Sequence, residues 1–218
     1  ALRMALSSRL AGDNLLVVKG FDLPEAKTKV FAKIAGNLGL SKALIIAPEE
    51  SRNLVLSSRN LPGITLVTFY ADCVPLYLVD PVKKAIGLSH SGWRGTVNRM
   101  GKATIEAMRR EYGSRPEELR CAIGPSICQD CYEVSGDVAV EFERAFAGHG
   151  HEILIAKENG KYQLDLWKAN EIVLLDAGVL PEHIEITDIC TCCNPDLLFS
   201  HRASHGKRGN LGAFLCLK

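Results

Sequence analysis

The sequence predicts an α/β fold in two parts, on three observations. Apolar runs of strand length alternate with segments whose apolar residues recur at helical spacing. In residues 1–68 each strand is separated from the next by a helix, which predicts a small βαβαβ segment with a parallel sheet. From residue 69 onward strands are denser, and two pairs of strands adjoin through turn residues, which predicts antiparallel hairpins.

The first part begins with a short apolar strand at residues 14–18. A helix follows from Leu23-Pro24-Glu25, because proline and glutamate suit a first helical turn, and Gly39 ends it. Its apolar residues fall at helical spacing: Val30, Phe31, Ile34 and Leu38. The remaining elements expected here are strands at 43–47 and 64–70 and a short helix at 53–60.

In the second part, residues 73–80 and 85–91 predict a hairpin through a turn that contains Pro81. A second hairpin is expected around Asn159-Gly160, a strong turn dipeptide. Glycines at 113 and 178 end two predicted helices. The elements in order are strands at 73–80 and 85–91, a helix at 96–112, a strand at 119–125, a helix at 137–147, strands at 153–156 and 162–164, a helix at 165–177, and strands at 184–189 and 211–217.

Charge and composition exclude several classes of function. The formal net charge of the 218 residues is +1, which does not favour nucleic acid or an acidic membrane surface as a partner. No apolar run approaches the ~20 residues that span a bilayer, and no signal peptide is recognisable. We therefore expect a cytoplasmic protein whose eight cysteines are reduced thiols or metal ligands.

Cys73 and His90 form the main candidate site, because each lies in one strand of the predicted hairpin. Side chains on one face of a sheet converge, and a thiolate with an imidazole suits zinc. Arg94 follows at a helix start, where arginine and backbone N–H groups favour phosphate. The competing interpretations are a buried cysteine, a hydrogen-bonded histidine and a surface arginine.

A second cysteine group predicts a structural metal site. Cys128-x-x-Cys131 resembles half of a zinc site, and the other half would come from a distant CxCC cluster: Cys190, Cys192 and Cys193. The CxCC spacing is unusual, so reduced cysteines in tight loops are the alternative.

Four motifs carry a resemblance to a known family: YADCVPLYLVDP (70–81), GLSHSGWRGT (87–96), AIGPSICQDCYEV (122–134) and CTCCNPDLLFSHRASHGKRGNLGAF (190–214). In order and spacing, residues 69–218 resemble the YfiH/YlmD laccase-domain family. The resemblance implies a layered α/β/β/α fold and a zinc-dependent purine nucleoside phosphorylase that also deaminates adenosine and cleaves methylthioadenosine.

The resemblance also assigns roles to residues. Cys73 and His90 match two of the three family metal ligands, and with Arg94 they are the expected catalytic residues. The FSHR segment is expected to contact substrate through Phe199, Ser200 and Arg202. The expected partners are a purine nucleoside and phosphate, and the expected cofactor is zinc, with copper as the alternative. A third ligand, a histidine in a Q-V-H-G motif, has no counterpart before Tyr70.

Residues 1–68 resemble something else, the C-terminal part of large-subunit ribosomal protein four. The sequence therefore predicts a chimera, with a ribosomal-like segment at 1–68 and a laccase-type domain at 69–218 that lacks the N-terminal portion usual in that family.

Three alternative functions remain open at this stage. Cys73 and His90 could act without metal as nucleophile and base, as in the cytotoxic necrotizing factor deamidases, which have a similar fold. The ribosomal-like segment could bind ribosomal RNA, although the long basic loop of that family is missing. An older assignment of the laccase-domain family is multicopper polyphenol oxidase.

Overall fold

The computed structural model describes residue 23 and residues 27–40, 43–44 and 64–217. The strand expected at 14–18 and the helix expected at 53–60 lie outside these residues. In chain order the elements are α2 (Thr28–Asn37), β1 (Ala43–Leu44), β2 (Ile64–Tyr70), β3 (Val74–Asp80), β4 (Ala85–Ser91), α4 (Trp93–Val97), α5 (Met100–Tyr112), β5 (Arg120–Ile123), β6 (Glu133–Val134), α6 (Gly136–Ala145), α7 (Gly150–Ile153), β7 (Leu154–Ala156), β8 (Tyr162–Leu164), α8 (Leu166–Asp176), β9 (Ile184–Ile186) and β10 (Leu211–Cys216). Three short 3₁₀ helices, η1 (Pro116–Glu118), η2 (Gln129–Cys131) and η3 (Pro181–His183), complete the described elements.

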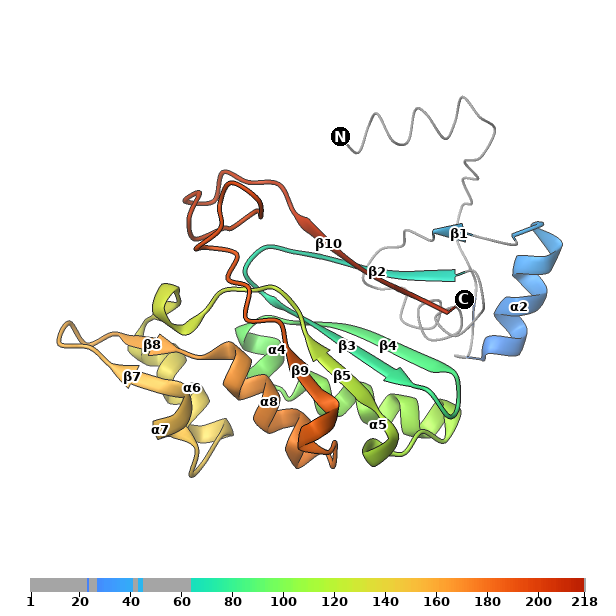
Figure 1. Cartoon of the computed structure of the whole chain (residues 1–218), viewed down its shortest axis with the longest axis horizontal. Helices are drawn as coiled ribbons and strands as arrows, with labels where there is room; N and C mark the ends of the chain where they lie inside the picture. Colours follow the sequence, from blue (N-terminus) through green and yellow to red (C-terminus); the bar gives the residue numbers. More distant parts are fainter. Residues whose placement is uncertain (1–22, 24–26, 41–42, 45–63, 218) are drawn as a thin grey trace.

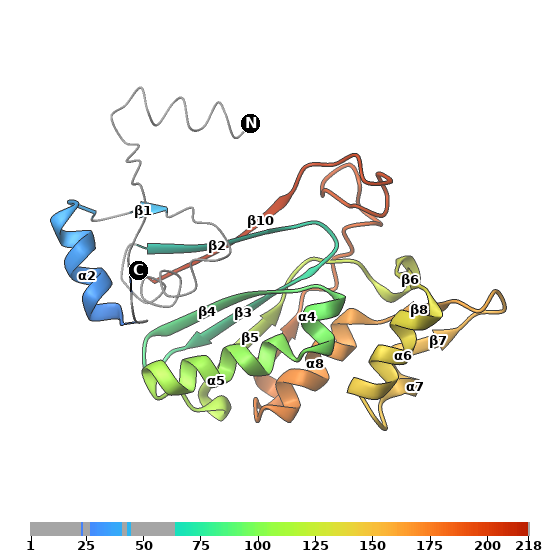
Figure 2. The same cartoon turned by 180° about the vertical axis from the view of Figure 1, so that it is seen from behind.

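A four-stranded sheet in the order β4-β3-β5-β9 forms the centre of the molecule. The β3–β4 hairpin is antiparallel and pairs Val74 with Ser91 and Pro75 with His90, which confirms the predicted hairpin. Its turn is fixed by the buried carboxylate of Asp80, whose Oδ1 accepts hydrogen bonds from the backbone N–H groups of Val82 and Lys83 at 2.9 and 2.8 Å. Helices α4, α5 and α8 cover one face of this sheet (Figures 1 and 2).

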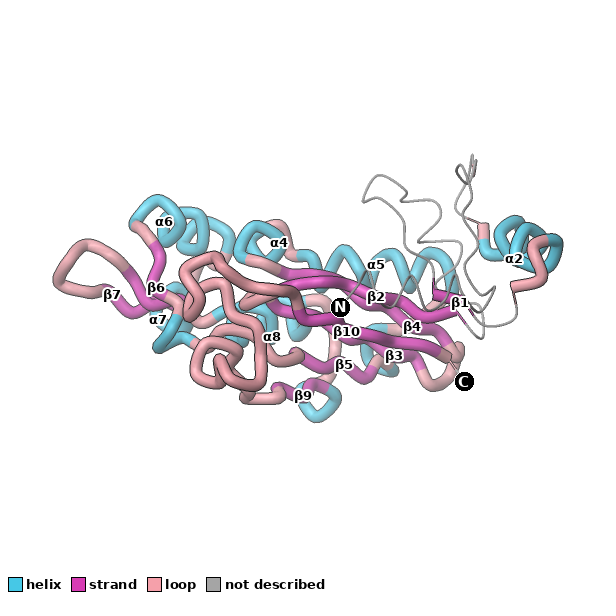
Figure 3. The backbone as a smooth tube through the Cα atoms, turned by 90° about the horizontal axis from the view of Figure 1, so that it is seen from above, coloured by secondary structure: helices cyan, strands magenta, loops and turns pink. Residues whose placement is uncertain are grey.

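A second, three-stranded sheet in the order β1-β2-β10 lies on the side of the central sheet opposite to these helices (Figure 1), so that β2 and β10 overlie the central sheet when it is seen from above (Figure 3). In it β2 pairs in parallel with β1 and antiparallel with β10, so the end of the ribosomal-like segment and the C-terminal strand share one sheet. Strands β2 and β10 both pack against β4. The two sheets and the helices form the layered architecture that the sequence predicted.

The core fills the space between the central sheet and its helices. Leu76 and Leu78 from β3, Ile123 from β5, Met108 from α5 and Val173 from α8 are at most 1% exposed and belong to one apolar cluster. Burial of each such side chain stabilises the fold by about 1.5–3 kcal/mol. A small sheet in the order β6-β8-β7 extends this core beside α6 and α7.

One predicted helix is divided in the structure. The helix expected at 96–112 is two helices, α4 and α5, because Arg99 adopts the left-handed conformation at φ 55° between them. The Arg99 side chain fixes this break, since it donates to Asp176 Oδ2 at 2.6 Å and to the carbonyl oxygen of Ala145 at 2.9 Å. The break lets α4 stand at the end of β4, next to His90.

In the described part of the chain, no helix has both the length and the apolar character that crossing a bilayer requires.

Candidate functional site

Cys73 and His90 converge on one point at the end of the β3–β4 hairpin. Cys73 directly precedes β3, and the strand register places it beside Gly92. A Cβ atom on Gly92 would lie 2.8 Å from Cys73 Sγ and 3.9 Å from His90 Nε2. Glycine leaves this space open, and the thiol and the imidazole both lie within 4 Å of the same point; their joint role as site residues stays a prediction.

Asp72 anchors two loops next to Cys73. Its buried side chain accepts a hydrogen bond from Thr191 Oγ1 at 2.6 Å and one from the backbone N–H of Arg202 at 2.8 Å. Its own carbonyl oxygen accepts from the N–H of Ile127 at 3.1 Å. Asp72 has φ 76°, a conformation that non-glycine residues rarely adopt, and these contacts hold it there. The backbone that carries Cys73 is thereby fixed to both loops.

The Cys73 thiol is half-buried, and burial raises its pKa. The carboxylate of Asp72 raises the pKa further, and the guanidinium of Arg208 opposes the rise. Without a metal ion the thiol is therefore protonated near neutral pH, whereas a bound cation would replace the proton.

Tyr132 also borders this point, although the sequence did not single it out. Burial raises the pKa of its hydroxyl to about 12, and the charge of Cys73 adds to the rise, while Arg202 and Arg94 oppose it. The Tyr132 hydroxyl therefore lies close enough to both candidate arginines to interact with their charges. A tyrosine next to a CxxC motif does not by itself indicate a functional residue, so its position near Cys73 could be recognised only in the folded structure.

Arg202 lies beside Tyr132 and forms one side of the candidate site. Its Nη2 donates to the carbonyl oxygen of Glu133 at 2.8 Å, and its guanidinium carbon lies 5.4 Å from the Tyr132 ring centroid. Arg94, at the start of α4, is exposed and lies with its guanidinium carbon 4.3 Å from the Trp93 ring centroid. Arg94 is thus the more accessible of the two cations.

The other two predicted substrate contacts have different environments. Phe199 is half exposed and packs over Gly209, where a Cβ would lie 2.9 Å from the ring. Ser200 is buried, and its Oγ accepts from the backbone N–H of Ala203 at 3.0 Å. Ser200 therefore shapes the loop, whereas Phe199 offers an aromatic surface; substrate contact by either residue stays a prediction.

A buried network of polar side chains joins the end of β4 to helices α4 and α8. Ser91 Oγ donates to Asn170 Oδ1 at 2.8 Å, and Asn170 Nδ2 donates to Thr96 Oγ1 at 3.1 Å and to the carbonyl oxygen of Leu166 at 2.8 Å. Ser91, Thr96 and Asn170 are fully buried. Asn170 therefore fixes α4 to α8. In the sequence it is recognisable only as a polar residue on the otherwise apolar face of a helix.

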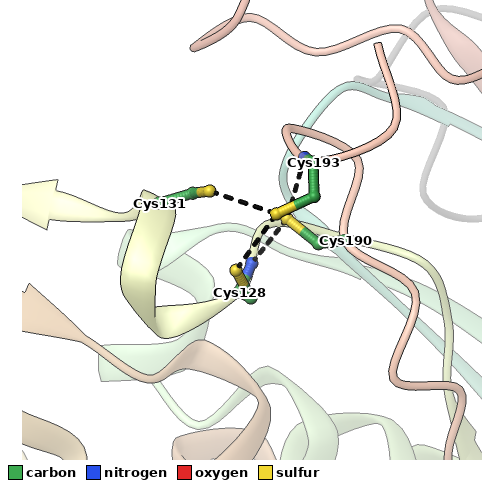
Figure 4. A group of neighbouring side chains, drawn as sticks. All are labelled: Cys128, Cys131, Cys190 and Cys193. Carbon is green, nitrogen blue, oxygen red and sulfur yellow. Dashed lines mark hydrogen bonds between the residues drawn. The ribbon is translucent and has the colours of Figure 1, made fainter. Parts of the chain in front are cut away.

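All eight cysteines are free thiols, and four of them form a second group (Figure 4). Sγ atoms of Cys128, Cys131, Cys190 and Cys193 all lie within 4.8 Å of one another, and among the described residues this is the one set of three or more potential ligands that could hold a metal ion. Burial opposes ionisation of Cys190, but backbone N–H groups of Cys128 and Cys193 donate to its sulfur and hold its pKa below the ordinary value.

The fifth cysteine predicted for this group, Cys192, is not among the four thiols that lie within 4.8 Å of one another, although its side chain hydrogen-bonds that of Cys131. Cys192 was included because it adjoins Cys193 in sequence. In the folded turn the ligand pair is Cys190-x-x-Cys193, so both halves of the group have the same CxxC spacing.

Comparison with known proteins finds two families in the chain, and the two matched ranges overlap at residues 56–76. Residues 56–218 match the model of the family described as multi-copper polyphenol oxidoreductase laccase, and residues 1–76 match that of the ribosomal protein L4/L1 family. The large ribosomal subunit protein uL4 of Nitratidesulfovibrio vulgaris (strain DP4) is 78% identical over 68 residues, which are 31% of this chain and 33% of that protein. Both resemblances are thereby confirmed.

The second part has enzyme relatives. Purine nucleoside phosphorylase YlmD of Bacillus subtilis (strain 168) is 36% identical over 159 residues, 73% of this chain and 57% of that protein. Adenosine deaminase RL5, from an unknown prokaryotic organism, is 40% identical over 142 residues, 65% of this chain and 54% of that protein. The chain thus spans little more than half the length of either relative.

The solved structure of YfiH from Bacillus licheniformis superimposes with a TM-score of 0.73 at 27% identity and covers 88% of this chain and 80% of that one. This likeness confirms the predicted fold class.

Proposed function

The chain belongs to the multi-copper polyphenol oxidoreductase laccase family through residues 56–218, and from this premise we propose that it is an enzyme that cleaves purine nucleosides with phosphate. The observation that carries the proposal is the convergence of Cys73 Sγ and His90 Nε2 beside Gly92. The names of two relatives, a purine nucleoside phosphorylase and an adenosine deaminase, indicate the substrate class.

The residues present supply part of a zinc site. Thiolate and imidazole are both zinc ligands, and Gly92 leaves room for an ion where a side chain would collide with Cys73. All six histidines lie at position 90 or beyond, so the first histidine ligand of the family has no counterpart in residues 1–89. We therefore expect Cys73 and His90 to hold zinc more weakly than a three-ligand site. Such an ion would polarise a substrate oxygen.

Phosphorolysis exchanges the glycosidic C–N bond of the nucleoside for a C–O bond to phosphate, and the base leaves with a proton. Arg94 is placed to attract the phosphate dianion, because it is exposed and stands at the start of α4. Phe199 offers a half-exposed ring on which a purine could stack. Asp72 holds the loop that carries Arg202 against Cys73 and so keeps the wall of the site in place.

The test is an assay of the purified full chain with inosine or adenosine, with and without phosphate and added Zn²⁺. Release of hypoxanthine or adenine that depends on phosphate would support the proposal, and release of inosine from adenosine would support the deaminase activity. If neither product forms at any zinc concentration, the proposal is wrong. Oxidation of a polyphenol with added Cu²⁺ would instead favour the older family assignment.

The metal-free alternative uses the same two side chains, with Cys73 as nucleophile and His90 as base. Iodoacetamide separates the two mechanisms, because Zn²⁺ bound through Cys73 would protect the thiol from alkylation. Equal alkylation of Cys73 with and without Zn²⁺ would favour the metal-free enzyme. The RNA-binding alternative rests on residues 1–68, most of which lie outside the described residues, and it stays a prediction.

A further inference from the structure

The four-thiol group has the dimensions of a tetrahedral metal site. The Sγ of Cys193 lies 3.5 Å from that of Cys131 and 3.9 Å from that of Cys128. Four sulfurs at about 2.3 Å from a central Zn²⁺ are separated by roughly 3.8 Å along each edge of the tetrahedron. Two of the six sulfur–sulfur separations are thus close to the zinc spacing, all six are at most 4.8 Å, and the side chains point toward one another (Figure 4).

The backbone around the group is arranged for thiolates. Cys190 Sγ accepts hydrogen bonds from the N–H groups of Cys128 at 3.3 Å and of Cys193 at 3.4 Å. Each CxxC pair lies in a tight turn: the first spans η2, and the second follows the bridge that joins Ser126 to Cys190. Turns of this kind let two sulfurs from one short segment face the same ion.

A charged group stands beside the site. An ion of charge +2 with four thiolates carries a net charge of −2, which needs nearby compensation. The guanidinium of Arg202 donates from Nη1 to the carbonyl oxygen of Cys131 at 3.4 Å, so it brings positive charge to the first turn.

We propose that Cys128, Cys131, Cys190 and Cys193 bind one structural zinc ion, separate from the ion expected at Cys73 and His90. Sulfur-only tetrahedral coordination selects zinc or iron, and zinc needs no redox partner. The ion ties the turn at 128–131 to the loop that follows residue 190. The proposal does not depend on the proposed enzymatic activity, since a structural ion can be present in an inactive chain.

A bound ion should also restrict the movement of the loop at residues 194–210. Residues 194–210 contain no helix or strand, and they lead from the second CxxC pair past Phe199 and Arg202 to β10. Beyond the ion, the start of this loop is fixed by Thr191 on Asp72 and by Asn194 Nδ2 on the carbonyl oxygen of Cys190. Loss of the ion should therefore loosen the loop.

Metal content of the full-length Cys73→Ala variant tests the proposal, because that substitution removes a ligand of the other expected ion. We expect one zinc per chain after purification, and a fall of roughly tenfold or more when Cys131→Ser and Cys193→Ser are added. Cys216→Ser is the matched control, because Cys216 is an exposed thiol of β10 outside the group, and this variant should retain the ion. A zinc content that is independent of Cys131 and Cys193 would overturn the proposal, and iron in place of zinc would overturn the choice of metal.

Two measurements on the Cys73→Ala chain guard against variants that fail to fold. Co²⁺ exchanged into the chain should show the intense thiolate-to-metal absorption of four sulfur ligands, and an absorption typical of two or fewer would contradict the site. Trypsin should cleave after Arg202, Lys207 and Arg208 several times faster once a chelator has removed the zinc. Unchanged cleavage would contradict the role assigned to the ion in the loop.

Discussion

The two thiol sites of this chain differ in where their donors come from. The four-thiol group takes all of its donors from two CxxC turns, and both turns lie within the laccase-type part. Cys73 directly precedes β3 and His90 lies in β4 of the same hairpin, and the third ligand that the family resemblance implies, a histidine, has no counterpart in residues 1–89. As the two sites are proposed here, the one whose donors come in local pairs is complete, whereas the one that needs a distant donor is incomplete.

The largest expected effect follows from removal of a donor from the incomplete site. Cys73→Ala should lower phosphorolysis by about a thousandfold, which corresponds to ~4 kcal/mol of transition-state stabilisation. The reason is that His90 alone cannot retain the ion. The same variant should keep the zinc of the four-thiol group, and loss of both ions together would show that the two sites are not independent. Steady-state rates with inosine and metal analysis of one sample give both results.

A substitution that fills the space between the donors should have the next largest effect. Gly92→Ala places a Cβ 2.8 Å from Cys73 Sγ, so the sulfur must move. Gly92 has φ −71° and ψ −179°, which alanine adopts without strain, so stability should change little. We expect a loss of activity of roughly 10–100-fold, as for displaced metal ligands.

Gly36→Ala is the matched control for that substitution. Gly36 lies in α2, and a Cβ there would meet nothing within 4 Å. Alanine in a helix is favoured over glycine by about 0.5–1 kcal/mol, so this variant should be slightly more stable and equally active. If Gly92→Ala behaves in the same way, the convergence of Cys73 and His90 has no functional meaning.

Removal of the buried Asn170 amide next to the site should lower the free energy of unfolding and leave the catalytic rate of the folded enzyme nearly unchanged. Asn170→Ala leaves the hydroxyls of Ser91 and Thr96 without their amide partner in a fully buried place. The expected cost is about 2 kcal/mol of unfolding free energy, or a fall in Tm of roughly 4–8 °C. Thermal denaturation measures it, with the exposed Asn98→Ala as control, for which a change within about 0.5 kcal/mol is expected. A cost as small as that of Asn98→Ala would show that the network does not hold α4 in place.

Local patterns predicted most of the architecture. The β3–β4 hairpin, the β7–β8 hairpin around Asn159-Gly160 and the helix ended by Gly178 are confirmed, because each depends on neighbours in sequence. The break at Arg99 was missed, because its cause is a pair of contacts with residues 46 and 77 positions away.

The candidate sites show the same difference: features set by neighbouring residues in sequence could be predicted, and features set by distant residues could not. Cys73 and His90 were predicted to lie close together because they flank one hairpin, and both lie within 4 Å of the point that a Cβ of Gly92 would occupy; their role stays a prediction. The cysteine group was predicted from spacing with Cys190, Cys192 and Cys193 alike, and only the folded turn shows that Cys190 and Cys193 are the two that lie within 4.8 Å of Cys128 and Cys131. Tyr132 had no signal at all, because its place depends on how two distant loops meet at Asp72.

The smallest expected effect concerns the phosphate rather than the ions. Arg94→Ala should raise the KM for phosphate by about fivefold, close to 1 kcal/mol, because an exposed arginine contributes little more than this to anion binding. Arg94→Lys should recover most of the loss, since it keeps the charge, and Arg110→Ala should change nothing, since Arg110 pairs with Glu111 on the surface of α5. A fall in kcat with an unchanged KM would instead place Arg94 in the chemical step.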